Sequence, residues 1–217
     1  MRLLSLALAL LLAPALALAN DAKGTPPTAK EARNTPTSQV MEGLAPMDRT
    51  ILDKGQMTDA RLAAFIHRVN GFEVKAGELA QKKATSASIR DYGRTLADDH
   101  AKADRDLTDV AKRAGLSLDD SALTATDKEK LGIEDNKLAV LERMDGKNFE
   151  VGFGTVLYNG HDAVIDMLNR HRGAIRSPDL RKLVADTLPV LEHHRDLAEK
   201  LKARPLPQGR PPVKSPR

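Results

Sequence analysis

The chain has no cysteine and no tryptophan, and aromatic residues make up only 3% of its 217 residues. Without cysteine it has neither a disulfide framework nor a thiol for lipid attachment, so its stability must come from packing. With so few aromatic rings, it also lacks the stacking platforms on which many nucleic-acid-binding proteins hold bases.

No long stretch of the central sequence carries charge of a single sign. The formal net charge is +4, but Arg2 and four basic residues in the last fifteen positions more than account for this excess. The remainder is close to neutral and interleaves acids with bases, so we expect no nucleic-acid partner. The Pro-rich basic tail at 204–217 is expected to make at most a weak contact with anionic envelope components.

Only one long hydrophobic run is present, and it lies at the N-terminus. Arg2 precedes an apolar stretch that ends in Ala17-Leu18-Ala19, which is typical of a secretory signal peptide with a small-residue cleavage site. The run is broken by Pro14 and is shorter than the ~20 residues that span a bilayer, so a membrane anchor is the weaker interpretation. We therefore predict a signal peptide at 1–19, export to the periplasm or outer membrane, and no transmembrane segment in the mature chain.

The rest of the chain divides by its hydrophobic pattern. Residues 20–57 are rich in Pro, Thr and Lys and predict a flexible leader with one weak apolar patch. Helical spacing of apolar residues then predicts four long helices near 58–84, 86–115, 145–173 and 177–203. A shorter helix near 127–143, with Thr126 and Glu129 as its capping box, fills the crossover between the second and third. The pattern predicts an all-α fold, an antiparallel four-helix bundle over 58–203.

Each long helix carries one ionisable residue on its apolar stripe, close to the helix midpoint. These residues are Glu73, His100, His161 and His194. Because the midpoints of antiparallel helices share a layer, we expect the four side chains to converge. Three imidazoles and a carboxylate suit one transition-metal ion such as Zn, Fe, Mn or Cu, and do not suit calcium or magnesium. The alternative is a metal-free hydrogen-bonded network in which each imidazole donates and Glu73 accepts.

Two further residues lie next to this layer. Asp99 precedes His100 and is a candidate hydrogen-bond partner that would support a metal-ligating residue without binding the metal itself. His193 lies next to His194, and we expect it at the rim of this layer. Gly160 and Pro189 lie just ahead of His161 and His194, where close backbone approach or a kink is expected.

Several segments resemble domain-of-unknown-function family 4142, a family of exported "predicted outer membrane protein" helical bundles. They are F-E-V-K-A-G-E-L-A at 72–80, L-A-D-D-H-A-K-A at 96–103, the His161 region, and T-L-P-V-L-E-H-H at 187–194. The resemblance covers 58–202 and implies a ferritin-like bundle exported in a Gram-negative-type bacterium, with no established activity. It also implies that Glu73, Asp99, His100, His161, Pro189 and His194 occupy the family's recurring positions.

The sequence gives little sign of an enzyme. Ferritin-like di-iron sites need a Glu three residues before each of two histidines, whereas Ala97, Tyr158 and Leu191 occupy those positions here. The sequence also shows no nucleophile paired with a base, no phosphate-binding Gly loop and no Gly-x-Ser-x-Gly elbow. Three functions stay open: an envelope binding or structural protein with one metal, a metalloenzyme or redox-stress protein with an open metal position, and a metal-free scaffold. The oligomeric state is not predicted.

Overall fold

The computed structural model describes residues 44–53 and 55–202, and over these residues the protein is all-helical. The predicted all-α class is confirmed. The predicted signal peptide, most of the predicted leader and the basic tail lie outside the described residues. Within them, no helix combines the length and the apolar character that crossing a bilayer requires.

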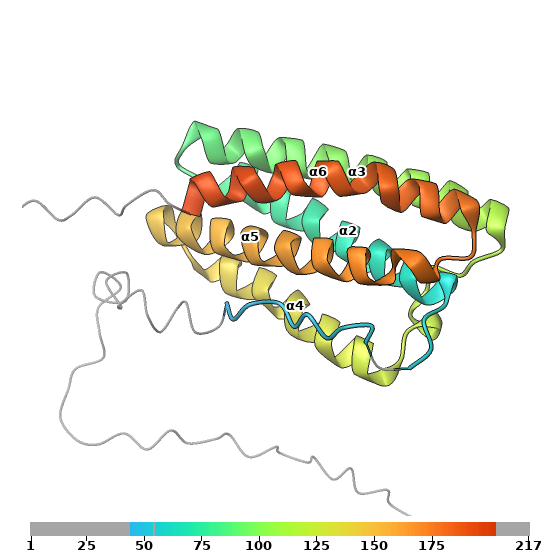
Figure 1. The fold of residues 1–217 in the computed structure, drawn as a ribbon. Coiled ribbons are helices and arrows are strands. Elements are labelled where there is room, and N and C mark those ends of the chain that lie inside the picture. Colours follow the sequence, from blue (N-terminus) through green and yellow to red (C-terminus); the bar gives the residue numbers. More distant parts are fainter. Residues whose placement is uncertain (1–43, 54, 203–217) are drawn as a thin grey trace, which may run out of the picture. The chain divides into compact units, whose positions relative to one another are not determined.

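Five α-helices account for most of the described chain (Figure 1). They are α2 (Asp59–Lys83), α3 (Ala87–Ala114), α4 (Ala125–Arg143), α5 (Gly146–His171) and α6 (Pro178–Lys202), with short 3₁₀ turns η2 (Asp120–Ala122) and η3 (Arg172–Ala174). The helix α2 packs most extensively on α3, and α5 on α6, while α3 also contacts α6 and α2 contacts α5. The shorter α4 lies outside these four helices, against α2 and α5.

Most helix boundaries follow from capping residues, as the sequence predicts. Thr58 Oγ1 accepts a hydrogen bond from Arg61 N at the start of α2, and Ser86 Oγ accepts one from Ile89 N at the start of α3. Gly115 ends α3 in the left-handed conformation, with φ of 65°. The predicted capping box of α4 is wrong: Thr124 and Asp127 form it. The Asp127 carboxylate accepts from Thr124 N, and the Asp127 backbone N–H donates to Thr124 Oγ1.

The predicted leader is wrong over its last part, because residues 44–53 pack on the helices. Leu44, Met47, Ile51 and Leu52 are buried, and they join the same apolar clusters as the long helices. Three of these residues were visible in the sequence as a weak apolar patch. Burying them together offsets the cost of ordering the segment. The packed part of the described chain therefore includes residues 44–53 as well as the helices.

A buried ion pair holds this segment to α2 and α4. Arg61 donates from Nε and Nη2 to the two carboxylate oxygens of Asp127, at 2.7 and 2.8 Å, and both side chains are 2% exposed. Asp127 also accepts from the backbone N–H groups of Thr124 and Leu52, and Arg61 Nη1 donates to Gln56 O. Although burial raises the pKa of Asp127, the hydrogen bonds from Arg61 and Thr124 lower it to about 2. The carboxylate is therefore ionised, and its charge is fully matched.

Two glycines set the distance between α2 and α3. A Cβ placed on Gly77 would lie 2.4 Å from Gly93 O, and one on Gly93 would lie 2.7 Å from Gly77 O. Only glycine permits this separation, because any side chain at either position would force the helices apart. The close crossing brings the polar residues of α2 beside those of α3.

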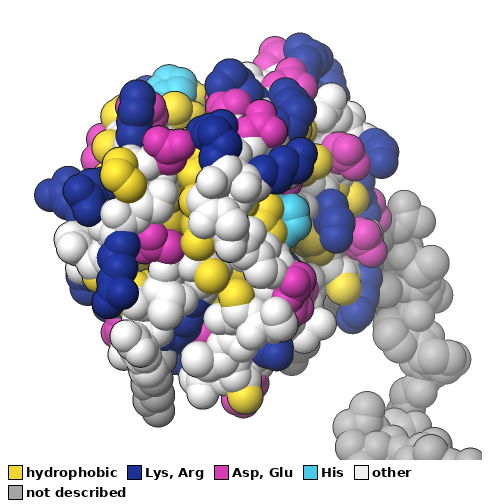
Figure 2. Space-filling view, turned by 90° about the vertical axis from the view of Figure 1, so that its right-hand side faces the viewer, with side chains coloured by type: hydrophobic (Ala, Val, Ile, Leu, Met, Phe, Trp, Pro, Cys, Tyr) yellow, Lys and Arg dark blue, Asp and Glu magenta, His cyan; other side chains and the backbone are white. Residues whose placement is uncertain are grey.

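A polar layer divides the apolar interior into two clusters. One cluster includes Phe65, Leu107, Leu168 and Leu191, and the other includes Ala76, Leu96, Leu157 and Ala198. Each long helix passes from one cluster to the other, α2 and α6 in one direction and α3 and α5 in the reverse direction. The residues at the crossing points are the ionisable ones that the sequence places on the inner stripes. On the face that Figure 2 shows, acidic and basic side chains are interspersed.

Candidate metal centre

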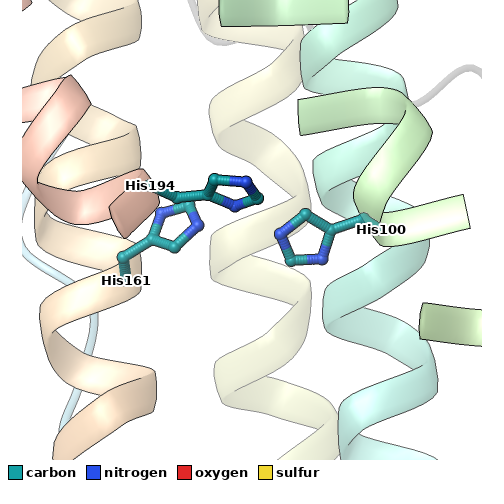
Figure 3. Close-up of side chains that lie close together, drawn as sticks. All are labelled: His100, His161 and His194. Atoms are coloured by element: carbon teal, nitrogen blue, oxygen red, sulfur yellow. The ribbon is translucent and has the colours of Figure 1, made fainter. Parts of the chain in front are cut away.

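Three histidines from three helices point toward one another inside the protein (Figure 3). His100 lies on α3, His161 on α5 and His194 on α6, and their side chains are 3%, 2% and 0% exposed. One ring nitrogen from each lies within 4.8 Å of the other two. The ring centroids are 5.4 to 5.8 Å apart. The sequence prediction that these three side chains converge is confirmed.

The other ring nitrogen of each histidine is already hydrogen-bonded, and these bonds fix the tautomers. His100 Nδ1 donates to Asn70 Oδ1 at 2.9 Å, and His161 Nδ1 donates to Leu157 O at 2.8 Å. His194 Nε2 donates to Asp99 Oδ2 at 3.0 Å. In a neutral imidazole the second nitrogen then carries a lone pair and can only accept.

Those second nitrogens have no partner among the described residues. They are His100 Nε2, His161 Nε2 and His194 Nδ1, and Glu73 Oε2 is unpartnered in the same way. Leaving several buried polar atoms unpaired is costly, and such groups in native proteins call for an unseen partner such as water or an ion. The metal-free network predicted as the alternative accounts for the hydrogen-bonded ring nitrogens and leaves the three unpartnered ring nitrogens unexplained.

Burial keeps the three rings neutral. It lowers the pKa of His100 well below the ordinary 6.5, and the neighbouring His161 and His194 lower it further. Burial, together with His194, lowers the pKa of His161 to about 3, although the bond to Leu157 O raises it in part. Burial also lowers the pKa of His194, against the opposing effect of Asp99. Neutral imidazoles are the form that binds metal ions.

Glu73 is buried beside the three histidines but is not one of the group. Its Oε1 lies 3.9 Å from His161 Nδ1, the nitrogen that faces the Leu157 carbonyl, and Glu73 lies outside the set of ligand atoms within 4.8 Å of one another. Of the four predicted ligands, the structure thus groups the three histidines, and the Glu73 carboxyl group lies on the flank of the His161 ring. Burial raises the pKa of Glu73 to about 8, so the metal-free protein holds it as a neutral acid at pH 7.

The two predicted outer residues differ in role. Asp99, 45% exposed, contacts His194 directly, so it holds that ring in place from the surface side. His193 is exposed, with its ring centroid 6.3 Å from that of His194, which matches the rim position that the sequence predicts.

Two positioning residues were not predicted. Asn70 is buried, accepts from His100 and donates to Asp104 Oδ1 at 3.4 Å. Tyr92 donates its hydroxyl hydrogen bond to the carbonyl oxygen of His194 at 3.0 Å. Asn70 lies three residues before Glu73, so both are on one helix face. This spacing could have indicated that Asn70 lies beside the histidine layer. Nothing local in the sequence indicates Tyr92, because its partner lies on another helix.

The metal-free protein is expected to be most stable near pH 6.5. Below that pH the unfolded chain binds up to three protons at histidines that stay neutral in the folded protein. In the opposite sense, Glu73 in the folded protein holds one proton that Glu73 in the unfolded chain has lost above pH 4.5. The unfolded state therefore binds about two more protons near pH 5, and stability falls by about 2–3 kcal/mol per pH unit on acidification. Above 6.5 the sign reverses: folded Glu73 keeps its proton up to about pH 8 while unfolded Glu73 does not, so stability falls as pH rises.

Urea unfolding with a chelator at about pH 5, 6.5 and 8 measures this profile. Glu73→Gln should remove the loss above pH 6.5 and leave the loss on acidification in place. Higher stability at pH 5 than at pH 6.5 would contradict the prediction, because it would mean that Asp99 or Glu73 keeps the histidines charged.

The fold and this geometry define a class, an all-helical protein with a buried layer of three neutral histidines that bring one ring nitrogen each within 4.8 Å of the other two. The family model described as "Domain of unknown function (DUF4142)" matches residues 46–201, which is most of the chain. The protein therefore belongs to this family. Comparisons with curated proteins and with solved structures find no match.

Proposed function

We propose that the protein is an exported, envelope-located binding protein that holds one transition-metal ion at the three histidines. The ligand atoms would be His100 Nε2, His161 Nε2 and His194 Nδ1. The observation that carries this proposal is that three buried, neutral rings bring one nitrogen each within 4.8 Å of the others, while one nitrogen of each ring has no hydrogen-bond donor among the described residues. Nitrogen ligands favour zinc, iron, manganese or copper over calcium and magnesium.

The surroundings support a bound ion. Asn70, Asp99 and the Leu157 carbonyl each bond the far nitrogen of one ring, which is the arrangement that orients ligating histidines in metalloproteins. A tetrahedral ion with bonds of about 2.0–2.1 Å holds its ligands roughly 3.3 Å apart, so the rings need only close in by about 1.5 Å or less.

We also propose that the four long helices form an antiparallel four-helix bundle of the ferritin-like type. Supporting this, α2, α3, α6 and α5 contact one another in that cyclic order, and each runs between the two apolar clusters in the direction opposite to its neighbours. Export is supported by the N-terminal sequence, in which a basic residue, an apolar run and small residues occur in the order of a signal peptide.

Metal titration of the purified, untagged mature chain tests the proposed function. After chelation and desalting, we expect one Zn(II) or Co(II) per chain by elemental analysis. Melting temperature should rise with added metal, since an ion at a thousand times its dissociation constant stabilises by about 4 kcal/mol. Less than a tenth of an ion per chain with no shift in melting would overturn the proposal.

One observation favours a second function, catalysis by the bound ion. Three protein ligands leave a fourth position, as in catalytic zinc sites, and Glu73 adds a buried carboxyl group beside His161 that can hold or accept a proton. Azide added to the Co(II) protein distinguishes the two functions: a shifted visible spectrum indicates an exchangeable position, and an unchanged spectrum indicates a closed shell suited to storage or structure.

A further inference from the structure

A narrow pocket reaches the flank of the histidine layer from between α2, α4 and α5. Its volume of about 30 Å³ has room for one or two water-sized groups. Asp135, 47% exposed, lies among its lining residues on the surface side, and Glu73, 4% exposed, lines its buried end. The pocket therefore spans from solvent to the carboxylate beside His161.

The carboxylates along this pocket differ in whether they have a partner. Near the surface, Glu134 accepts from Lys137 Nζ at 2.6 Å, and Asp135 pairs with Arg68. At the buried end Glu73 Oε2 has no hydrogen-bond donor in the part of the chain that the structure describes. Glu73 is thus a buried carboxylate whose oxygen is free to bind an incoming group.

Gly160 keeps the buried end open. A Cβ at this position would meet only Glu73 Oε1, at 3.9 Å, so the missing side chain leaves space directly against the carboxylate. Gly160 immediately precedes His161 in α5, so this space lies beside the segment that carries one of the three histidines.

One alternative route to the histidines is apolar and less suited to a cation. A second pocket of about 20 Å³ touches His100 and Asn70, but its other lining residues are almost all apolar, including Val69, Val164 and Leu191. A hydrated cation would lose its water there without a charged replacement, which is costly. On the α3–α6 side, a surface groove ends at Asp99, and the fully buried His194 ring lies behind it.

We propose that a divalent transition-metal ion reaches the three histidines through the pocket between α2, α4 and α5, with Glu73 as a transient ligand on the way. The ion exchanges water for a Glu73 oxygen, and the Glu73 carboxyl group releases its proton to solvent through the pocket. The ion then exchanges that oxygen for the ring nitrogens, and Glu73 takes up a proton again. This inference rests on the proposed metal site and adds the route and the transfer residue.

Stopped-flow mixing of the metal-free full mature chain with Co(II), followed by its visible absorbance, tests the route. Glu73→Gln keeps the shape and removes the carboxyl group that loses its proton to bind the ion, and Gly160→Ala places a methyl group in the pocket at ordinary contact distance. We expect both variants to slow association at least about tenfold while still binding one ion per chain, because the histidines are intact. Asp106→Asn, which alters an exposed acid on the α3–α6 groove, is the matched control and should associate as the wild type does.

The outcomes separate this proposal from the proposed function. If wild-type protein binds no ion, the metal site itself fails. If it binds one ion but neither variant slows association, the route is wrong while the site stands. If Glu73→Gln alters the final Co(II) spectrum and weakens affinity without slowing association, Glu73 is a permanent ligand and its transfer role is wrong. Should Glu73→Gln fail to fold, Gly160→Ala alone decides the route.

Discussion

Replacing His161 with leucine is expected to lower the affinity for Zn(II) or Co(II) by more than about a hundredfold, since losing a ligand costs more than losing an outer partner. It should also abolish the metal-dependent rise in melting temperature. That rise corresponds to about 4 kcal/mol at a thousandfold excess over the dissociation constant, or roughly 10 °C for a domain of this size. His161 suits the test because its outer partner, the Leu157 carbonyl, lies in the same helix and keeps its backbone hydrogen bond.

Without metal, His161→Leu should be neutral or stabilising. The substitution replaces a buried, half-satisfied imidazole with an apolar group of similar size. His193→Gln is the matched control, because it changes a neighbouring exposed histidine outside the group. Isothermal titration and thermal unfolding with and without metal measure both effects. An unchanged Zn(II) affinity in His161→Leu would show that the ion binds elsewhere.

Arg61→Met is expected to give the largest loss of folding stability among single substitutions, about 3–5 kcal/mol. It leaves the Asp127 carboxylate buried and ionised without its cation, and breaking one half of a buried pair carries that cost. The segment at 44–53 should loosen at the same time, because Asp127 also accepts from Leu52 N. Urea unfolding gives the free energy, and proteolysis near residue 52 reports the loosening.

Arg113→Met provides the comparison for this ion pair. Arg113 donates to Asp179 at 3.1 Å, but both side chains are more than half exposed, so the loss should stay below about 1 kcal/mol. Equal costs for the two substitutions would mean that the Arg61–Asp127 pair contributes no more than a surface pair.

The helix ends and the inward histidines were predictable because they depend on local rules. Ser86 and Gly115 show this for α3, where a capping hydroxyl and a left-handed glycine are sequence-local signals. His100 and His194 could be placed inside from spacing alone, since period and length decide which face is buried. The capping box of α4 was missed because Thr124 and Thr126 offer the same chemistry two residues apart, and the choice depends on the contact of Asp127 with Arg61.

Features that depend on rotamers and on distant partners could not be predicted. Periodicity placed Glu73 on the correct face, but the direction of its carboxylate is set by packing beside Gly160 and His161. The docking of residues 44–53 depends on contacts with α4 and α5, such as those of Leu52 N with Asp127 and of Arg49 with Asp162, which no local pattern encodes. Tyr92 acquires its role only when the helices are assembled, because the His194 carbonyl that it contacts lies on α6.

The polar layer between the two apolar clusters also sets how far each helix can slide along its neighbours. A shift of one turn, about 5.4 Å, would carry an imidazole among leucines and phenylalanines and part it from Asn70 or Asp99. Purely apolar interiors tolerate such slippage far better, because one leucine replaces another at little cost. The histidines therefore fix the axial alignment of the helices before any ion is bound, so that the chain folds into one alignment with its ligand nitrogens already facing a common point.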